Sequence, residues 1–204
     1  MLPLIETIRA EKGRLMHSSF HNDRMNESAS KLYGRSFSFD VDAVFSDLIP
    51  FDGMIYRCRI TYSDRIIKSE LFPYQKKPIR SLQIVNANRL EYRFKFEDRT
   101  EINALFDLKE KADDILIVKN GLITDSSMAN LIIFDGKRYY TPAIPILHGT
   151  CRARLLSENK IIPIDIKPGD LAHLESFTLI NAMRDFDPTD FNPIKNINIP
   201  IIFK

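Results

Sequence analysis

Hydrophobic and polar positions change their period along the chain, and this change separates expected helices from expected strands. Apolar residues recur at roughly helical spacing after Ser18, which predicts a helix capped by Ser18 or Ser19, running to about Lys31 and ended by Gly34. Over residues 54–72 the pattern alternates every second residue instead. This alternation predicts two antiparallel strands joined by a tight turn.

Shorter apolar runs predict the remaining elements. We expect strands at 2–8, 82–86, 115–118, 130–134, 139–140, 161–166, 177–183 and 199–203, and helices at 42–48, at 99–111 and from residue 150. Strands outnumber helices and follow mostly in hairpin order, so the pattern predicts an α+β protein. The best linker candidate is 73–80, which is rich in proline and basic residues. We therefore expect an N-terminal α+β domain over 1–80 and a C-terminal domain over 81–204.

Composition narrows the class of protein. The 204 residues are 44% hydrophobic and 27% charged, and the net charge is +2, which argues against a disordered tail or a collagen-like repeat. We expect no nucleic-acid partner, because no long basic run is present, and no membrane partner, because no apolar stretch approaches the roughly 18 residues of a span. No signal-peptide pattern is seen, so a cytoplasmic location is expected. Cys58 and Cys151 have no metal-ligand spacing, so no metal site is predicted and two free thiols are expected.

Three features could carry chemistry. Aromatic residues flank Lys95, and burial near apolar groups would make its amine a nucleophile, although an exposed strand lysine would look the same. Asp125 follows the turn signal Asn120–Gly121 and could hold a cationic ring nitrogen or simply cap a turn. Gly149 and Thr150 stand where a loop enters a helix, which suits a phosphate or an ordinary helix cap. Together, a lysine, a carboxylate and a helix start are what pyridoxal phosphate (PLP) requires.

Six short motifs then follow one another in a recognisable order. They are Glu6–Arg9, His21–Met25, Lys95 with Arg99, Gly121–Asp125 with Asn130, Thr141–Pro142 and Gly149–Arg152. In this order and spacing the sequence resembles the class IV aminotransferases, which are the fold-type IV PLP enzymes and include aminodeoxychorismate lyase. The resemblance implies a two-domain fold with a small α/β domain and a larger pseudo-barrel domain, PLP as the cofactor, and a homodimer.

The resemblance also assigns roles in holding the cofactor. Lys95 looks like the lysine that forms the Schiff base and moves the proton, with Lys119 as the rival candidate. Arg24 looks like the phosphate-binding arginine, whose fork matches a phosphate. Asp125 stands where the family usually has a glutamate facing the pyridine nitrogen.

Further cofactor contacts are implied at the predicted helix start. After Gly149, the backbone N–H groups of Thr150 and Cys151 look like the pair that meets the phosphate. The family often has threonine where Cys151 stands, so a hydroxyl contact is expected to be missing. Asn181 resembles part of a second phosphate-side loop.

The leading hypothesis for the reaction is the conversion of the small molecule 4-amino-4-deoxychorismate to 4-aminobenzoate and pyruvate, a step of folate biosynthesis. Thr7 stands where lyase-like members place a hydroxyl near the reacting atoms. Arg57 and Arg59 point to the same strand face and suit a dicarboxylate substrate, or they simply solvate an exposed face.

Two other functions stay open on the sequence alone. One is a transaminase for branched-chain or D-amino acids. The other is a non-catalytic binding protein on a degenerate scaffold, for which Asp125 is one motive. The second motive is that family members usually begin with a strand hairpin before the segment matching Glu6, so part of the small domain's sheet is expected to be absent.

Overall fold

The computed structural model describes residues 2–34 and 36–200 and divides into two compact units. The first runs up to Lys76 and includes Phe94–Asp98, and the second comprises Lys77–Arg93 and the chain from Arg99 onward. Residues 94–98 thus belong with the first unit, although the sequence analysis gave them to a C-terminal domain. The division into two domains at residue 80 stays a prediction.

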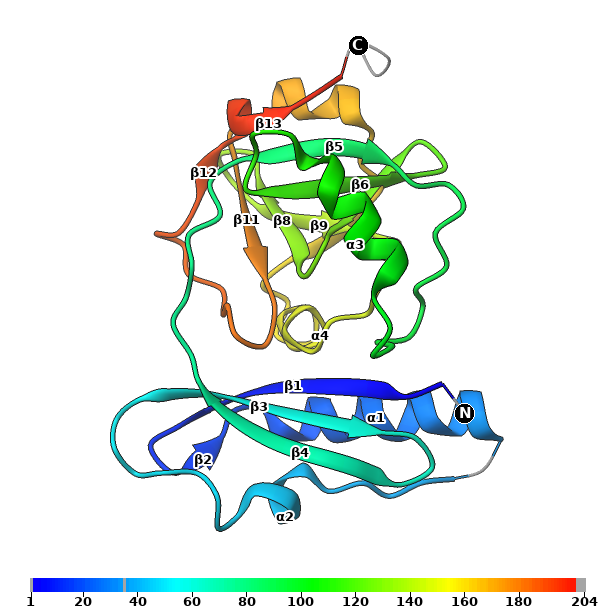
Figure 1. Cartoon of the computed structure of the whole chain (residues 1–204). Coiled ribbons are helices and arrows are strands. Elements are labelled where there is room, and N and C mark those ends of the chain that lie inside the picture. The colour runs from blue at the N-terminus through cyan, green and yellow to red at the C-terminus, as the bar shows by residue number, and fades with distance from the viewer. Residues whose placement is uncertain (1, 35, 201–204) are drawn as a thin grey trace. The chain divides into compact units, whose positions relative to one another are not determined.

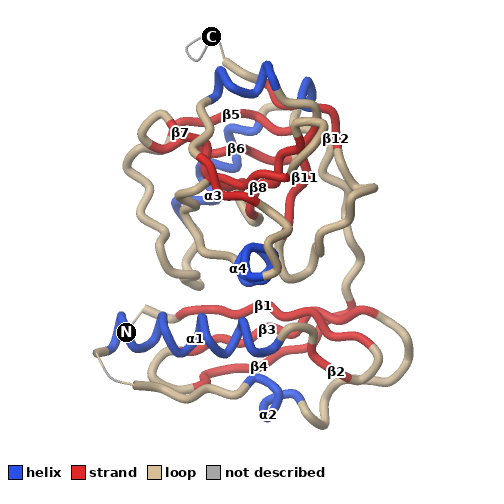
Figure 2. The backbone as a smooth tube through the Cα atoms, turned by 180° about the vertical axis from the view of Figure 1, so that it is seen from behind, coloured by secondary structure: helices blue, strands red, loops and turns tan. Residues whose placement is uncertain are grey.

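The first unit is built on an antiparallel sheet with the strand order β2-β1-β3-β4 (Figure 1). Its strands are β1 (Leu4–Glu11), β2 (Arg14–Leu15), β3 (Ile55–Tyr62) and β4 (Ile66–Pro73). Alternate residues of β1 and β3 are buried on one face, and helix α1 (Ser18–Tyr33) lies along the sheet (Figure 2). Met25 and Ala29 of α1 join these strand residues in one apolar core. The antiparallel pairing of β3 with β4 confirms the pair predicted at 54–72.

The ends of the helices in this unit test the capping residues predicted from the sequence. Gly34 ends α1 with a φ of 73°, a left-handed conformation that glycine adopts without strain, as predicted. The predicted serine cap is wrong, because His17 holds the cap position at φ 55°, where its side chain makes no capping hydrogen bond, and Ser18 is already helical. The short helix α2 (Val41–Phe45) is capped by Asp40, whose carboxylate accepts from two backbone N–H groups.

The segment 94–98 belongs to the first unit because it pairs with β1. The N–H of Ile5 donates to the carbonyl of Lys95 at 2.9 Å, and the N–H of Glu97 donates to the carbonyl of Pro3 at 2.9 Å. Phe94 and Phe96 pack against the apolar core of the unit. Backbone pairing and two aromatic anchors therefore fix the position of the Lys95 backbone on β1.

The second unit contains a larger sheet, which has nine strands among the described residues. Its main path is β10-β9-β8-β7-β6-β5-β13, and β11 pairs with β8 and β12. The strands are β5 (Leu82–Asn86), β6 (Asp114–Lys119), β7 (Leu122–Ser126), β8 (Asn130–Phe134), β9 (Tyr139–Pro142), β10 (Ile162–Ile164), β11 (Ser176–Ile180), β12 (Asn192–Pro193) and β13 (Ile197–Asn198). The expected hairpin order holds only in part, because β5–β6, β5–β13 and β9–β10 are parallel pairs.

Successive side chains of β8 point to opposite faces of this sheet and lie in two different apolar cores. Leu131 and Ile133 of β8 face the larger core, around which the strands curl (Figure 1), whereas Ile132 lies in a smaller cluster with Leu155 of helix α4 (Thr150–Ser157). The α+β fold predicted from the sequence is confirmed. No helix in the described part of the chain is long and apolar enough to cross a bilayer.

Several predicted boundaries need correction. The turn Asn120–Gly121 is present, with both φ angles positive, as its sequence indicated. The helix expected at 99–111 is divided into α3 (Thr100–Phe106) and a 3-10 turn. The strand expected at 177–183 ends at Ile180, because the chain turns back there. Of the strand expected at 199–203, residues 201–203 lie outside the described residues, and residues 199–200 are not in a strand.

Candidate active site

The site residues predicted from the sequence divide between the two units. The first unit holds Thr7, Arg24, Arg57, Arg59 and Lys95. The second unit holds Asp125, Gly149, Thr150, Cys151 and Asn181.

The two candidate lysines, Lys95 and Lys119, lie in different surroundings. Lys95 is half-buried, on the segment that pairs with β1. The amine of Lys119 instead donates to the carbonyl of Leu90 at 2.6 Å and to the carboxylate of Glu91 at 2.7 Å. These contacts account for the Lys119 amine without a cofactor, and the choice of Lys95 as the Schiff-base lysine stays a prediction.

Arg24 on α1 is held by a buried acid on β1. Its Nε donates to Oε1 of Glu6 at 2.8 Å and its Nη2 donates to Oε2 at 2.6 Å, a two-pronged contact. Oε2 of Glu6 also lies 2.7 Å from Nδ1 of His21, one turn earlier on the same helix. Glu6 and His21 are both almost fully buried.

The charges of this cluster follow from its contacts. Burial raises the pKa of Glu6, but Arg24 and His21 together outweigh burial and bring it down to about 2. Burial lowers the pKa of His21 and is opposed by Glu6, while Lys95 lowers it further by charge repulsion. Near neutral pH, therefore, Glu6 is ionised and a neutral His21 donates its Nδ1–H to it.

The opposite face of the sheet of the first unit carries the predicted substrate residues. Thr7 lies directly opposite Arg59 in the β1–β3 register, and Arg57 is on the same face, two residues along. Arg59 pairs with Glu97 at 3.1 Å, yet its buried Nε has no hydrogen-bond partner among the described residues. The guanidinium of Arg57 instead lies over the ring of Phe72, 5.1 Å from its centroid.

In the second unit, Asp125 fixes the loop that leads into α4. Its Oδ1 accepts from Nδ2 of Asn130 at 2.8 Å, and its Oδ2 accepts from the N–H of Leu147 at 2.9 Å. Nδ2 of Asn130 also donates to the carbonyl of Leu147 at 2.9 Å. Burial raises the pKa of Asp125 to about 6, against these donors and the nearby charge of Arg152. The carboxylate is thus mostly ionised at pH 7.

The residues at the start of α4 suit an anion. Gly149 holds the cap position, no side chain caps the helix there, and the first turn contains no acidic residue. A Cβ on Gly149 would lie 2.0 Å from Oδ1 of Asn130, so the loop packs directly against that amide. The helix start therefore presents backbone N–H groups and a positive dipole end.

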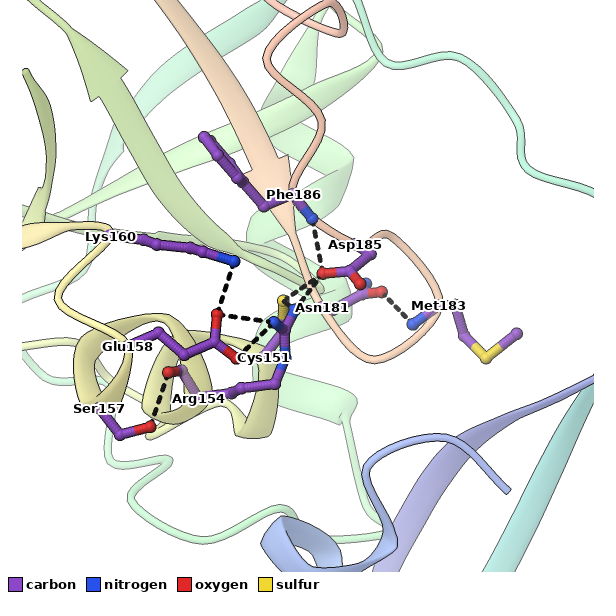
Figure 3. A network of polar contacts seen from close by, with 9 residues as sticks. All are labelled: Cys151, Arg154, Ser157, Glu158, Lys160, Asn181, Met183, Asp185 and Phe186. Atoms are coloured by element: carbon purple, nitrogen blue, oxygen red, sulfur yellow. Dashed lines mark hydrogen bonds and ion pairs between the residues drawn. The ribbon is translucent and has the colours of Figure 1, made fainter. Parts of the chain in front are cut away.

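Cys151 and Asn181 lie in a network that ties α4 to the turn after β11 (Figure 3). The thiol of Cys151 lies 3.6 Å from Oδ1 of Asp185, and burial raises its pKa to about 12. Oδ1 of Asn181 accepts from the N–H of Met183 at 2.9 Å, and its Nδ2 donates to the carbonyl of Met128 at 3.1 Å. The described contacts of these two side chains are structural, and their contacts to a cofactor stay predictions.

The sequence analysis gave no role to Glu6, His21 or Asn130. A signal for Glu6 was present, because it falls on the buried face of an otherwise apolar alternation, and a buried acid requires a partner. His21 is four residues from a second buried helix position, Met25, which placed it on the same face. Nothing local marked the Asn130–Gly149 contact, which joins residues far apart in the sequence.

Comparison with known proteins identifies the family of the chain. A family model of class IV amino-transferases matches residues 66–189, more than half of the chain, so the chain belongs to that family. The resemblance stated from the six motifs is thereby confirmed. The family depends on PLP.

One similar sequence and two similar solved structures illustrate the family. The chain is 37% identical over 185 residues to an uncharacterized protein of Haemophilus influenzae, covering 90% of this chain and 98% of the relative. It is 37% identical, with a TM-score of 0.86, to the crystal structure of a "putative 4-amino-4-deoxychorismate lyase" from Haemophilus somnus, covering 91% and 98% of the two chains. A hypothetical aminotransferase from Mycobacterium tuberculosis in its PLP-bound form shares 13% identity and the fold, with a TM-score of 0.74 over 96% of this chain and 81% of that one.

Proposed function

We propose that the protein is a PLP-dependent lyase that converts 4-amino-4-deoxychorismate to 4-aminobenzoate and pyruvate. The observation that carries the proposal is the grouping on β1 of the first unit. Thr7 lies opposite Arg59, and the backbone of Lys95 pairs with Ile5, two residues from Thr7. An amine, a hydroxyl and a guanidinium thus come from neighbouring positions of one sheet. The likeness to the Haemophilus somnus protein supports the same substrate.

The start of α4 is one feature that fits the phosphate group of PLP. That helix start has no capping side chain and no acid in its first turn, so it suits a phosphate. Arg24 supplies a guanidinium of fixed orientation. Asp125 supplies a buried carboxylate that is mostly ionised at pH 7 and suits a protonated ring nitrogen. Lys95 would hold the cofactor covalently, as the family resemblance implies.

Bound PLP supplies an electron sink for the carbon that bears the substrate's amine. The residues of the chain would then act around that carbon. Nζ of Lys95 would take the proton from it and return a proton later. The hydroxyl of Thr7 would pass or hold a proton beside Lys95. Because loss of pyruvate makes the product ring aromatic, the protein has mainly to orient the substrate and move protons.

The cations on the open face of the β1–β3 pair would recognise the substrate's carboxylates. The buried Nε–H of Arg59, which has no partner among the described residues, is a donor that a carboxylate would satisfy. Arg57 is stacked on Phe72 and presents its charge in a restricted orientation. We propose Arg59 as the stronger of the two contacts.

Transamination of a branched-chain or D-amino acid is the second candidate. It is favoured by one observation: Arg59 is already paired with Glu97, which reduces the positive charge available to a dicarboxylate. A transaminase needs only one carboxylate contact for its amino acid. The same lysine would serve, and an α-keto acid would be the acceptor.

We also propose that the protein acts as a cytoplasmic homodimer, as the family resemblance implies. Light scattering of the purified protein would test this assembly. A mass of about twice the 23.7 kDa chain is expected, and the mass of a single chain would contradict it.

The decisive experiment measures 4-aminobenzoate formed from 4-amino-4-deoxychorismate with added PLP. Wild type is compared with Lys95→Ala and with Lys119→Ala as a matched control. We expect product with wild type and Lys119→Ala and none with Lys95→Ala.

Other outcomes would redirect the proposal. Retained PLP without product, together with conversion to the pyridoxamine form by one amino acid, would favour the transaminase. Retained PLP with no turnover of any amine would point to a binding protein on a degenerate scaffold. Absence of PLP binding would overturn the proposed function.

A further inference from the structure

Two members of the buried cluster of Glu6, His21 and Arg24, namely Glu6 and His21, have no role in the function proposed above. We propose that Glu6 is a positioning residue that orients Arg24 for the cofactor phosphate, with His21 fixing Glu6 in turn. The inference rests on the proposed function, because it concerns the phosphate of PLP.

The geometry of the ion pair shows what Glu6 does to the guanidinium. Arginine has five N–H groups. Glu6 accepts from the Nε–H and from Nη2, at 2.8 and 2.6 Å, and so occupies the Nε side of the fork. The Nε side of the guanidinium is therefore not available to a phosphate. Two contacts to one carboxylate fix both the plane and the direction of the guanidinium.

His21 completes the arrangement from the helix side. Its Nδ1 lies 2.7 Å from Oε2, the oxygen that also accepts from Nη2 of Arg24. Glu6 is thus held between two side chains that lie three residues apart on α1, and it cannot rotate without losing both contacts. Its complete burial excludes water as a replacement partner.

The negative charge of Glu6 opposes this role, so whether removing it lowers or raises the affinity for the phosphate tests the inference. Glu6 partly neutralises Arg24 and by itself would weaken the attraction of an anion. A loosely held arginine, however, has to be ordered on binding, and a carboxylate-held one does not. We infer that orientation outweighs charge here, because the pair is buried and two-pronged.

The test compares the dissociation constants of PLP and of pyridoxal, which lacks the phosphate, from the absorbance of each when bound to Lys95. Loss of an oriented, charge-assisted contact predicts that Glu6→Gln lowers the PLP-to-pyridoxal affinity ratio by about tenfold. Pyridoxal affinity should stay near that of wild type. In an Arg24→Gln background the same substitution should have no further effect on the ratio.

Glu11→Gln is the matched control. Glu11 also lies on β1 and pairs with an arginine, but its described ion pair, at 2.7 Å, is with Arg9. Its ratio should equal that of wild type. Glu6→Asp keeps the buried charge and gives a second variant should Glu6→Gln fail to fold. It should lower the ratio by a smaller factor, because the shorter side chain cannot reach both nitrogens.

Each outcome separates this inference from the proposed function. A wild type that binds neither aldehyde overturns both. A wild type that binds PLP, with an unchanged or raised ratio in the Glu6 variants, overturns only the positioning role. An equal fall in pyridoxal affinity would show that Glu6 supports the whole site and would also overturn that role.

Discussion

Replacing Gly149 by alanine would place a methyl group where another side chain already lies. The new Cβ would be 2.0 Å from Oδ1 of Asn130, far inside contact distance. The backbone is not the obstacle, since Gly149 has φ −72° and ψ 143°, which any residue adopts. The cost of Gly149→Ala therefore comes entirely from displacing Asn130.

The magnitude follows from what Asn130 would lose. Its Nδ2 donates to the carboxylate of Asp125 and to the carbonyl of Leu147, at 2.8 and 2.9 Å. Together these bonds are worth about 3 kcal/mol, the larger part from the charged acceptor. Alanine at an unstrained position returns roughly 0.5–1 kcal/mol by stiffening the unfolded chain. The net loss of unfolding free energy is thus about 2 kcal/mol.

Urea unfolding followed by circular dichroism measures this loss, since the chain has no tryptophan. With a slope of about 2 kcal/mol per molar urea, the midpoint should fall by about 1 M. Gly169→Ala is the control, because no heavy atom lies within 4 Å of its added Cβ, and it should leave the midpoint unchanged or slightly raised.

Replacing Asn130 by alanine removes the group that the new methyl would displace. Without the Asn130 amide, Gly149→Ala should become neutral or stabilising by up to about 1 kcal/mol. A loss of stability as large as in wild type would refute the contact with Asn130 as its cause.

Three further predictions concern titration and access. The fold holds the pKa of Glu6 at about 2, against an ordinary 4.5, so ionised Glu6 stabilises the fold above pH 4.5. The free energy by which wild type is more stable than Glu6→Gln should therefore shrink by about 3 kcal/mol between pH 5 and pH 2. A difference independent of pH in urea titrations would contradict this. Asp125 has the opposite shift, to a pKa of about 6 from 3.8. The stability of wild type relative to Asp125→Asn should therefore fall by about 2 kcal/mol as the pH rises from about 4 to 6, and a rise would show that the fold favours its charged form. Burial raises the pKa of both Cys58 and Cys151 to about 12. An aromatic disulfide reagent at pH 8 should therefore label neither thiol until the protein is unfolded. Rapid labelling of the native protein would refute their burial.

The elements that depend on neighbouring residues were predictable from the sequence. Gly34 ends α1 and Asn120–Gly121 turns β6 into β7, because both signals reflect the conformations that those residues tolerate. The alternation of β3 placed Arg57 and Arg59 on one face for the same kind of reason. The motif order was sufficient to recognise the family.

The order of the strands in the larger sheet could not be predicted from signals between neighbouring residues. Adjacent strands suggested hairpins, yet β5 pairs in parallel with both β6 and β13, more than 100 residues apart in the case of Leu82 and Ile197. Parallel pairing needs a crossover, and a crossover leaves no local pattern in the strands themselves. The pairing of 94–98 with β1 likewise moved Lys95 into the first unit.

The order of residues along the chain was enough to identify the candidate chemical groups, which are Lys95, Arg24, Asp125 and the helix start at Gly149. How each group is held depends on contacts that form only in the folded protein. Glu6 reaches Arg24 from another element, and Asn130 makes glycine the only residue that fits at 149 without displacing it. The reason is physical: capping and turn signals act within a few residues, whereas ion pairs and steric contacts in a folded core join positions that only the fold brings together.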